Sequence, residues 1–187
     1  MPIGSPVVGP SNQTTPPPSA APAQRAAHAA AVGTRMPPHY AGCFGCGPGN
    51  AAGLQLQMTA LDGVSVRSSF QVAEHHEGAP GLAHGGVLSA ALDEALGSLL
   101  WVMATPAVTG RLEVDYLTPV PVGRTVVIDV TCTGVDGRKI YTEGVGRLDA
   151  PDGEVAIRGA GLFIAVSFEH FAKHGGTTDT LPGPFNP

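Results

Sequence analysis

The chain has 187 residues and a formal net charge of −5, from 10 Lys and Arg against 15 Asp and Glu. This acidic balance, without a basic patch, argues against a nucleic-acid-binding protein. Three cysteines, an odd number, in a chain without an apolar secretory segment predict free thiols in a reducing compartment, so we expect a cytoplasmic protein.

Composition divides the chain into three parts. Residues 1–35 consist mainly of Pro, Ala, Ser, Thr and Gly, and such a segment cannot bury enough apolar surface to offset its ordering entropy. We therefore predict a disordered arm over 1–35, one folded domain of ordinary length over 36–172, and a flexible tail over 173–187.

The predicted domain begins near two thiols in a glycine-rich turn, Cys43-Phe44-Gly45-Cys46. This pair resembles one zinc knuckle, but two sulfurs are only half of a structural site. His39 and Cys132 could complete it in principle. Because there is no second Cys pair, we predict no metal, and we find no phosphate-cradling loop or other motif that indicates a cofactor.

A long apolar segment, Gly85–Ala104, reads GGVLSAALDEALGSLLWVMA and predicts a helix of about five turns. A helix that is apolar on nearly every face either spans a membrane or is enclosed by protein. Two adjacent carboxylates near its middle, Asp93 and Glu94, argue against the membrane. We therefore predict a buried central helix and no membrane span.

Strands on both sides of this helix in the sequence supply the enclosure. Their residues alternate between apolar and polar or are rich in β-branched and aromatic types, and Asp-Gly pairs mark hairpin turns between the last ones. Glycines inside the later strands suit bending or close backbone approach. The pattern predicts an α+β fold in which one antiparallel sheet curls around one helix. The predicted strands are 54–60, 64–72, 111–116, 126–133, 140–148 and 155–168.

Four segments in this order resemble the PaaI-like acyl-CoA thioesterases of the hotdog-fold superfamily, over about residues 40–168. His-Gly-Gly followed by an Asp nine residues after the His is the active-site motif of that family, and it stands here at His84 and Asp93. The resemblance implies a hotdog fold, hydrolysis of an acyl-CoA substrate and a homodimer. The segments are Cys43–Leu54 (CFGCGPGNAAGL), Leu82–Gly97 (LAHGGVLSAALDEALG), Val108–Pro121 (VTGRLEVDYLTPVP) and Gly123–Thr133 (GRTVVIDVTCT).

The motif predicts thioester chemistry at the start of the helix. Backbone N–H groups of a first helical turn have no internal partner, and the helix dipole makes that end electropositive. Gly85 N–H is therefore the predicted oxyanion donor, Gly86 allows substrate to approach the backbone, and His84 could orient the loop or help to hold the thioester. Asp93 would either attack the carbonyl carbon or deprotonate a water.

The spacing of the motif predicts a dimer. Gly85 and Asp93 are eight residues apart, about 12 Å along a helix axis. A donor and a nucleophile that serve one carbonyl must each lie within roughly 3 Å of it. Two antiparallel helices across a two-fold axis satisfy this, so each site would combine Gly85 of one subunit with Asp93 of the other. A dimer of dimers stays open.

Two further residues are candidates beside Asp93. Glu94 competes for the carboxylate role, but adjacent helical positions point about 100° apart and Asp93 has the family spacing. We expect Glu94 to meet a polar partner at the dimer seam and keep it among the substrate-binding candidates. In the subfamily that the chain resembles, a Thr or Ser at the position of Thr109 hydrogen-bonds the nucleophile or its attacking water.

The phosphates of CoA favour basic side chains on exposed strands or turns, and the candidates are Arg111, Arg138 and Lys139. A non-catalytic hotdog protein that binds acyl-CoA or another small ligand is the alternative function. A hydratase or dehydratase would need a different arrangement of His and acid. The motif of His84, Gly85 and Asp93 favours hydrolysis, and the sequence leaves the acyl group open.

Overall fold

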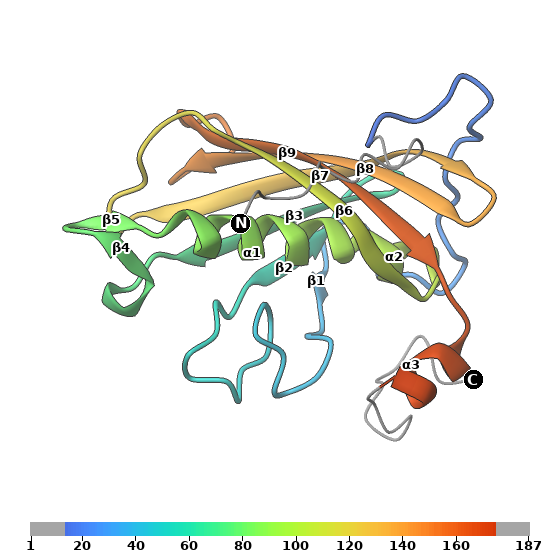
Figure 1. Cartoon of the computed structure of the whole chain (residues 1–187), viewed down its shortest axis with the longest axis horizontal. Helices are drawn as coiled ribbons and strands as arrows, with labels where there is room; N and C mark the ends of the chain where they lie inside the picture. The colour runs from blue at the N-terminus through green and yellow to red at the C-terminus, as the bar shows by residue number, and fades with distance from the viewer. Residues whose placement is uncertain (1–13, 175–187) are drawn as a thin grey trace, which may run out of the picture.

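A seven-stranded antiparallel sheet lies along one side of a central helix in the computed structural model, which describes residues 14–174 (Figure 1). The order of its strands is β1-β2-β3-β7-β8-β9-β6, so β1 and β6 form the edges. The predicted α+β fold, with one antiparallel sheet packed on one long helix, is confirmed. The sheet contains β1 (Arg35–Met36), β2 (Gln57–Ala60), β3 (Ser65–Gln71), β7 (Thr125–Asp136), β8 (Lys139–Leu148), β9 (Val155–Ala165) and β6 (Ala107–Tyr116).

The helical part consists of α1 (Gly85–Gly97) followed directly by α2 (Leu99–Met103), and a short α3 (Phe168–His174) follows the last strand. A small hairpin precedes α1: the 3₁₀ turn η1 (Glu74–His76), β4 (Glu77–Ala79) and β5 (Leu82–Ala83). Because β4 pairs with β5 immediately before His84, this hairpin fixes the direction from which the chain enters α1.

Only one side of α1 is covered by the sheet. Its buried residues recur at helical spacing and form one apolar stripe against the strands: Leu88, Ala91, Leu92, Ala95 and Leu96. Gly85–Met103 is long and apolar enough to cross a membrane, by length and composition alone. The core helix of a soluble protein passes the same test, and 50% of this helix is buried inside the protein. The helix was expected to be enclosed on nearly every face, whereas one sheet covers only half of it.

A pair of glycines lets α1 approach the sheet closely. Gly144 and Gly159 lie opposite each other in β8 and β9, beneath the side chain of Leu92. A Cβ at Gly159 would overlap Leu92, and one at Gly144 would lie 3.2 Å from Leu92 Cδ1. Close backbone approach, one of the two reasons expected for the strand glycines, is therefore confirmed at these two positions.

Residues 14–34 differ from the expectation of a disordered arm. Ala21 forms an isolated bridge with Val135 of β7, and the Arg25 guanidinium donates to the carbonyl of Leu61 at 3.0 Å. Ala26 N–H donates to the carbonyl of Val102 at 2.9 Å. Backbone hydrogen bonds hold this segment against the fold even though its side chains are small. Composition alone does not reveal such backbone contacts. Residues 1–13 and 175–187, which include most of the predicted tail, lie outside the described residues.

Candidate active site

The start of α1 is capped by its own motif histidine. His84 has an extended backbone, φ −66° and ψ 134°, and its Nδ1 accepts a hydrogen bond from Gly86 N–H at 2.8 Å. The hydroxyl of Tyr116, at the end of β6, donates to the Gly85 carbonyl at 3.0 Å. Gly86 N–H is thus used by the cap, whereas Gly85 N–H belongs to the turn that has no intrahelical acceptors.

Asp93 lies in the third turn of α1, half-buried and held by one specific partner. Thr109 Oγ1, near the start of β6, donates to Asp93 Oδ1 at 3.0 Å. Burial raises the pKa of Asp93; the Thr109 hydrogen bond lowers it and the nearby Glu94 raises it, and the net result lies above the ordinary value. The expected contact between Thr109 and the carboxylate is present, and Asp93 is a stronger base than an exposed aspartate.

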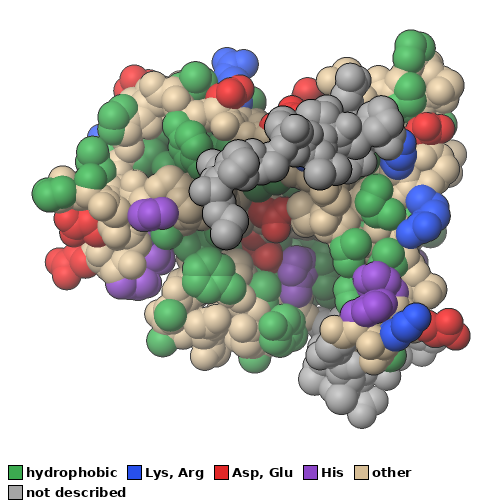
Figure 2. All heavy atoms as spheres, in the orientation of Figure 1, with side chains coloured by type: hydrophobic (Ala, Val, Ile, Leu, Met, Phe, Trp, Pro, Cys, Tyr) green, Lys and Arg blue, Asp and Glu red, His purple; other side chains and the backbone are tan. Residues whose placement is uncertain are grey.

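A cavity of about 360 Å³ opens beside Asp93 and Thr109, between α1, β6, β9 and α3. On the face of the molecule shown in Figure 2, acidic and histidine side chains gather in a central hollow. A mostly apolar cavity with a few convergent polar groups is the usual form of a small-ligand site. Its apolar walls include Leu100, Trp101, Val108, Phe163, Phe168 and Phe171.

One chain does not bring Gly85 and Asp93 together. Both lie on α1, about 12 Å apart along its axis. The edge strand β6 connects their surroundings, because Tyr116 contacts the first turn and Thr109 contacts Asp93. Gly85 N–H and the Asp93 carboxylate of one chain are therefore too far apart to contact the same small group.

Glu94 was expected to meet a polar partner at a dimer seam, but its side chain has partners within its own chain. Its Oε1 lies 3.0 Å from His39 Nδ1, and Cys43 Sγ donates to its Oε2 at 3.6 Å. Burial alone would raise the pKa of Glu94, but His39 and the thiols hold it below its ordinary value. Burial lowers the pKa of His39, yet Cys43 and Glu94 together raise it to about 9.

The structure separates the three basic candidates for CoA binding. Arg111 pairs with Glu113 at 2.8 Å, and Glu113 lines the outer face of the sheet, opposite α1. Arg138 and Lys139 lie at the β7–β8 hairpin, where Arg138 donates to the carbonyl of Ala165 at 2.9 Å. Ala165 is at the end of β9 that borders the apolar cavity. The Arg138 guanidinium thus contacts a strand end beside the cavity, whereas Arg111 pairs with Glu113 on the other face of the sheet. None of the three basic side chains lines the cavity.

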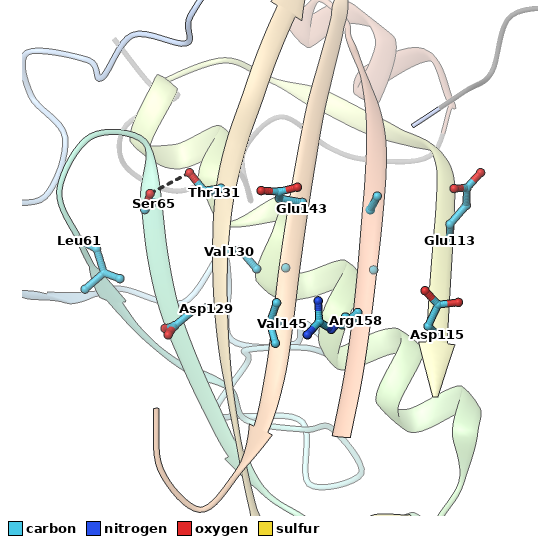
Figure 3. Close-up of a pocket in the computed structure, with 13 residues that line it drawn as sticks. Leu61, Ser65, Glu113, Asp115, Asp129, Val130, Thr131, Glu143, Val145 and Arg158 are labelled. Atoms are coloured by element: carbon cyan, nitrogen blue, oxygen red, sulfur yellow. Dashed lines mark hydrogen bonds between the residues drawn. The ribbon is translucent and has the colours of Figure 1, made fainter. Parts of the chain in front are cut away.

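A larger hollow, of about 550 Å³, lies on the outer face of the sheet, with α1 behind the strands (Figure 3). Its wall carries the carboxylates of Glu113, Asp115, Asp129 and Glu143 around Arg158. Most of these charges would repel an anionic coenzyme, and none of the predicted catalytic residues reaches this hollow. The smaller cavity beside Asp93 is therefore the candidate site.

Sequence reasoning missed Tyr116, which contacts the start of α1, and two aromatic residues of α3, which line the cavity beside Asp93. Tyr116 contacts the Ser89 hydroxyl and the Gly85 carbonyl, but its place at a strand end carries no recognisable sequence signal. The aromatic residues of α3 line the cavity although they lie at the boundary of the predicted tail. Both depend on which segments the sheet brings beside α1.

Comparison with known proteins agrees with the fold. The family model of the thioesterase superfamily matches residues 80–151, from β5 to the end of β8. Over these residues the chain is similar to the thioesterase superfamily, which confirms the expected resemblance and the predicted hotdog fold. Among curated proteins, acyl-coenzyme A thioesterase THEM4 of Xenopus laevis is 36% identical over 73 residues. That match covers 39% of this chain and 33% of THEM4, so the chain corresponds to about a third of that relative's length.

Solved structures of similar fold include a thioesterase superfamily protein and two proteins of lower sequence identity. Protein RHA08564, a thioesterase superfamily protein, has 33% identity and a TM-score of 0.58, over 63% of this chain and 60% of its own. The protein smu.793 of Streptococcus mutans UA159, bound to acetyl CoA, has 18% identity and a TM-score of 0.55, over 60% and 89%. E. coli PaaI has 15% identity and a TM-score of 0.56, over 61% and 81%. The last two show likeness of fold alone.

Proposed function

We propose that this protein hydrolyses an acyl-CoA thioester to a free acid and CoA, with sites shared between two subunits. The observation that carries the proposal is the Asp93 carboxylate, held by Thr109 at 3.0 Å and facing an apolar cavity. The names of relatives such as THEM4, and the acetyl CoA bound to smu.793, support the substrate class.

In this mechanism Asp93 acts as a general base. It takes a proton from a water whose oxygen attacks the thioester carbonyl carbon, and the carbonyl oxygen becomes an oxyanion. Gly85 N–H of the other subunit stabilises that oxyanion at the positive end of its helix. The tetrahedral intermediate then collapses, the C–S bond breaks, and the proton on Asp93 passes to the departing CoA thiolate.

Two features of the single chain support a dimer. The apolar helix Gly85–Met103 is only half buried, and β6 is an edge strand with ten residues and no fully buried side chain. An exposed apolar helix face and an unpaired strand edge both favour association with another copy. An antiparallel pair of α1 helices would also bring Gly85 of each subunit toward Asp93 of its partner.

The proposed activity is tested by thiol release from a panel of acyl-CoA thioesters that differ in acyl length and aromaticity. We expect release of free CoA well above the buffer rate for at least one class of thioester, because base, donor and cavity are all present. Isothermal titration with the same thioesters provides the contrast. Tight binding without thiol release would identify a binding protein and contradict the hydrolase.

Thr109→Val is expected to lower kcat/KM about tenfold, the effect of one hydrogen bond to a charged group. Because the Thr109 hydroxyl lowers the pKa of Asp93, its loss raises that pKa further. Hydrolysis needs ionised Asp93, so the acidic limb of the pH–rate profile should move to higher pH. Thr109→Ser, which keeps the hydroxyl, is the control and should leave the limb near its original position. An unchanged limb in the valine variant would exclude Thr109 as the positioning residue.

A further inference from the structure

Four metal-binding side chains meet beside the candidate site, outside the thioesterase motif. His39, Cys43 and Cys46 come from the segment before β2, and Glu94 comes from α1. One potential ligand atom of each residue lies within 4.8 Å of the ligand atoms of all the others. We refer to these four residues as the Cys₂HisGlu cluster.

We propose that the Cys₂HisGlu cluster is a structural zinc site. In a tetrahedral zinc site with bonds of about 2.0–2.3 Å, the ligand atoms lie roughly 3.3–3.8 Å apart. His39 Nδ1 is 3.0 Å from Glu94 Oε1, and Cys43 Sγ is 3.6 Å from Glu94 Oε2. All four ligand atoms lie within 4.8 Å of one another, so an ion among them would draw in the widest pair by at most about 1 Å.

Burial and charge also favour a cation. Cys46 is 4% exposed, and the side chains of His39 and Glu94 are 20% and 13% exposed. A buried carboxylate beside two thiols needs positive charge, and a single imidazole is the only basic group in the cluster. Glu94 Oε1 is buried without a hydrogen-bond partner in the described part of the chain, so these polar groups do not fully satisfy one another.

The backbone of the turn is shaped around these side chains. A Cβ at Gly45 would overlap the Glu94 carboxylate, so only glycine lets the turn approach α1 this closely. His39 N–H donates to Cys46 Sγ at 3.1 Å, an interaction that stabilises a thiolate. Leu56 N–H donates to the Gly45 carbonyl at 2.9 Å and ties the turn to the start of the sheet.

The ligand types select the metal. Thiolate and imidazole ligands favour zinc and similar transition metals over magnesium and calcium, which prefer oxygen. Four protein ligands leave no open position for a reacting water, which is typical of a structural site. The ion would attach the Cys43–Cys46 turn to α1 next to Asp93. It would also hold His39, which stacks on Trp101 with ring centroids 4.8 Å apart, in the wall of the apolar cavity.

The sequence led us to expect no metal because two sulfurs were only half of a site. His39 is in the cluster, as one of the two residues considered for completing it. Cys132, the other one, lies on β7, donates to the carbonyl of Tyr141 on β8 at 3.2 Å, and takes no part in the cluster. The fourth ligand is the helix residue after Asp93, which no local motif indicates.

The test is the metal content of the full chain, purified under reducing conditions without chelator and measured by plasma mass spectrometry. We expect about one zinc per chain, because one set of four ligands is present. Cobalt added to the metal-free protein should give the intense visible bands of a tetrahedral site and a thiolate charge-transfer band. Cys46→Ser should weaken metal affinity at least about a hundredfold, since even residues that only support ligands contribute 10–100-fold.

Cys132→Ser is the matched control, because it removes a half-buried thiol outside the cluster and should keep the full zinc content and the cobalt spectrum. If Cys46→Ser does not fold, Glu94→Gln provides the second variant and should lose affinity while both thiols remain. No metal uptake by the reduced wild-type chain would overturn the proposal. Equal uptake by the Cys46→Ser and Cys132→Ser chains would overturn it as well. Neither readout uses turnover, so the result is independent of the proposed hydrolase activity.

Discussion

Replacing Asp93 with Asn is expected to lower kcat/KM for thioester hydrolysis by about a thousandfold, within the range that a general base contributes. The amide has nearly the same shape and can still accept the Thr109 hydrogen bond through its oxygen. It cannot take the proton from water. Thiol release with the best acyl-CoA, measured at saturating and limiting substrate, provides the comparison.

The Asn variant should also fold normally. Burial and Glu94 both raise the pKa of Asp93, which means that folding disfavours its ionised form. Replacing the carboxylate with a neutral amide should therefore not destabilise the domain. Asp115→Asn, on the outer face of the sheet, is the control for loss of one acidic group and should keep full activity. If the Asp93→Asn variant were fully active, Asp93 would not be the base, and either Glu94 would take that role or the hydrolase proposal would fail.

The second large effect is expected at the first residue of α1. Gly85→Pro removes the proposed oxyanion donor, because proline has no N–H, and should lower kcat about a hundredfold or more. Proline is well tolerated at the first helical position, and His84 already has the extended conformation that precedes a proline. Gly85→Ala keeps the N–H and would place its Cβ 3.6 Å from the Tyr116 ring, an ordinary contact, so it is the matched control.

Mixing the two damaged chains tests the shared site directly. In a heterodimer of Asp93→Asn and Gly85→Pro subunits, one site receives both intact groups and the other receives neither. Random exchange of equal amounts should therefore restore about a quarter of wild-type activity if the protein is a two-fold dimer. Heterodimers verified by native mass spectrometry that show no recovery would mean that each subunit contains its own complete site.

The helix and the strands that follow it were predictable because their periodicities are local. Residues 85–104 were expected to form one helix, and the structure has α1 and α2 over Gly85–Met103. The hairpins at Asp136-Gly137 and Asp152-Gly153 were expected from turn chemistry, and β7, β8 and β9 pair in that order. Residues 14–34 were less predictable, because backbone bridges rather than apolar side chains place them against the fold.

The sequence was enough to predict the fold class, from the periodicities of the helix and the strands, and the His84, Gly85 and Asp93 motif, from residue types and spacings within one helix. The distant side chains that contact Asp93 and Glu94 became known from the packing of the folded chain. Pairing of β6 with β9 brings Thr109 to Asp93, and packing of the Cys43–Cys46 turn on α1 brings His39 and two thiols to Glu94. Contacts between residues 16 or 48 positions apart depend on the register of strands and the packing of loops. Those are set by the whole core, so no local pattern records them.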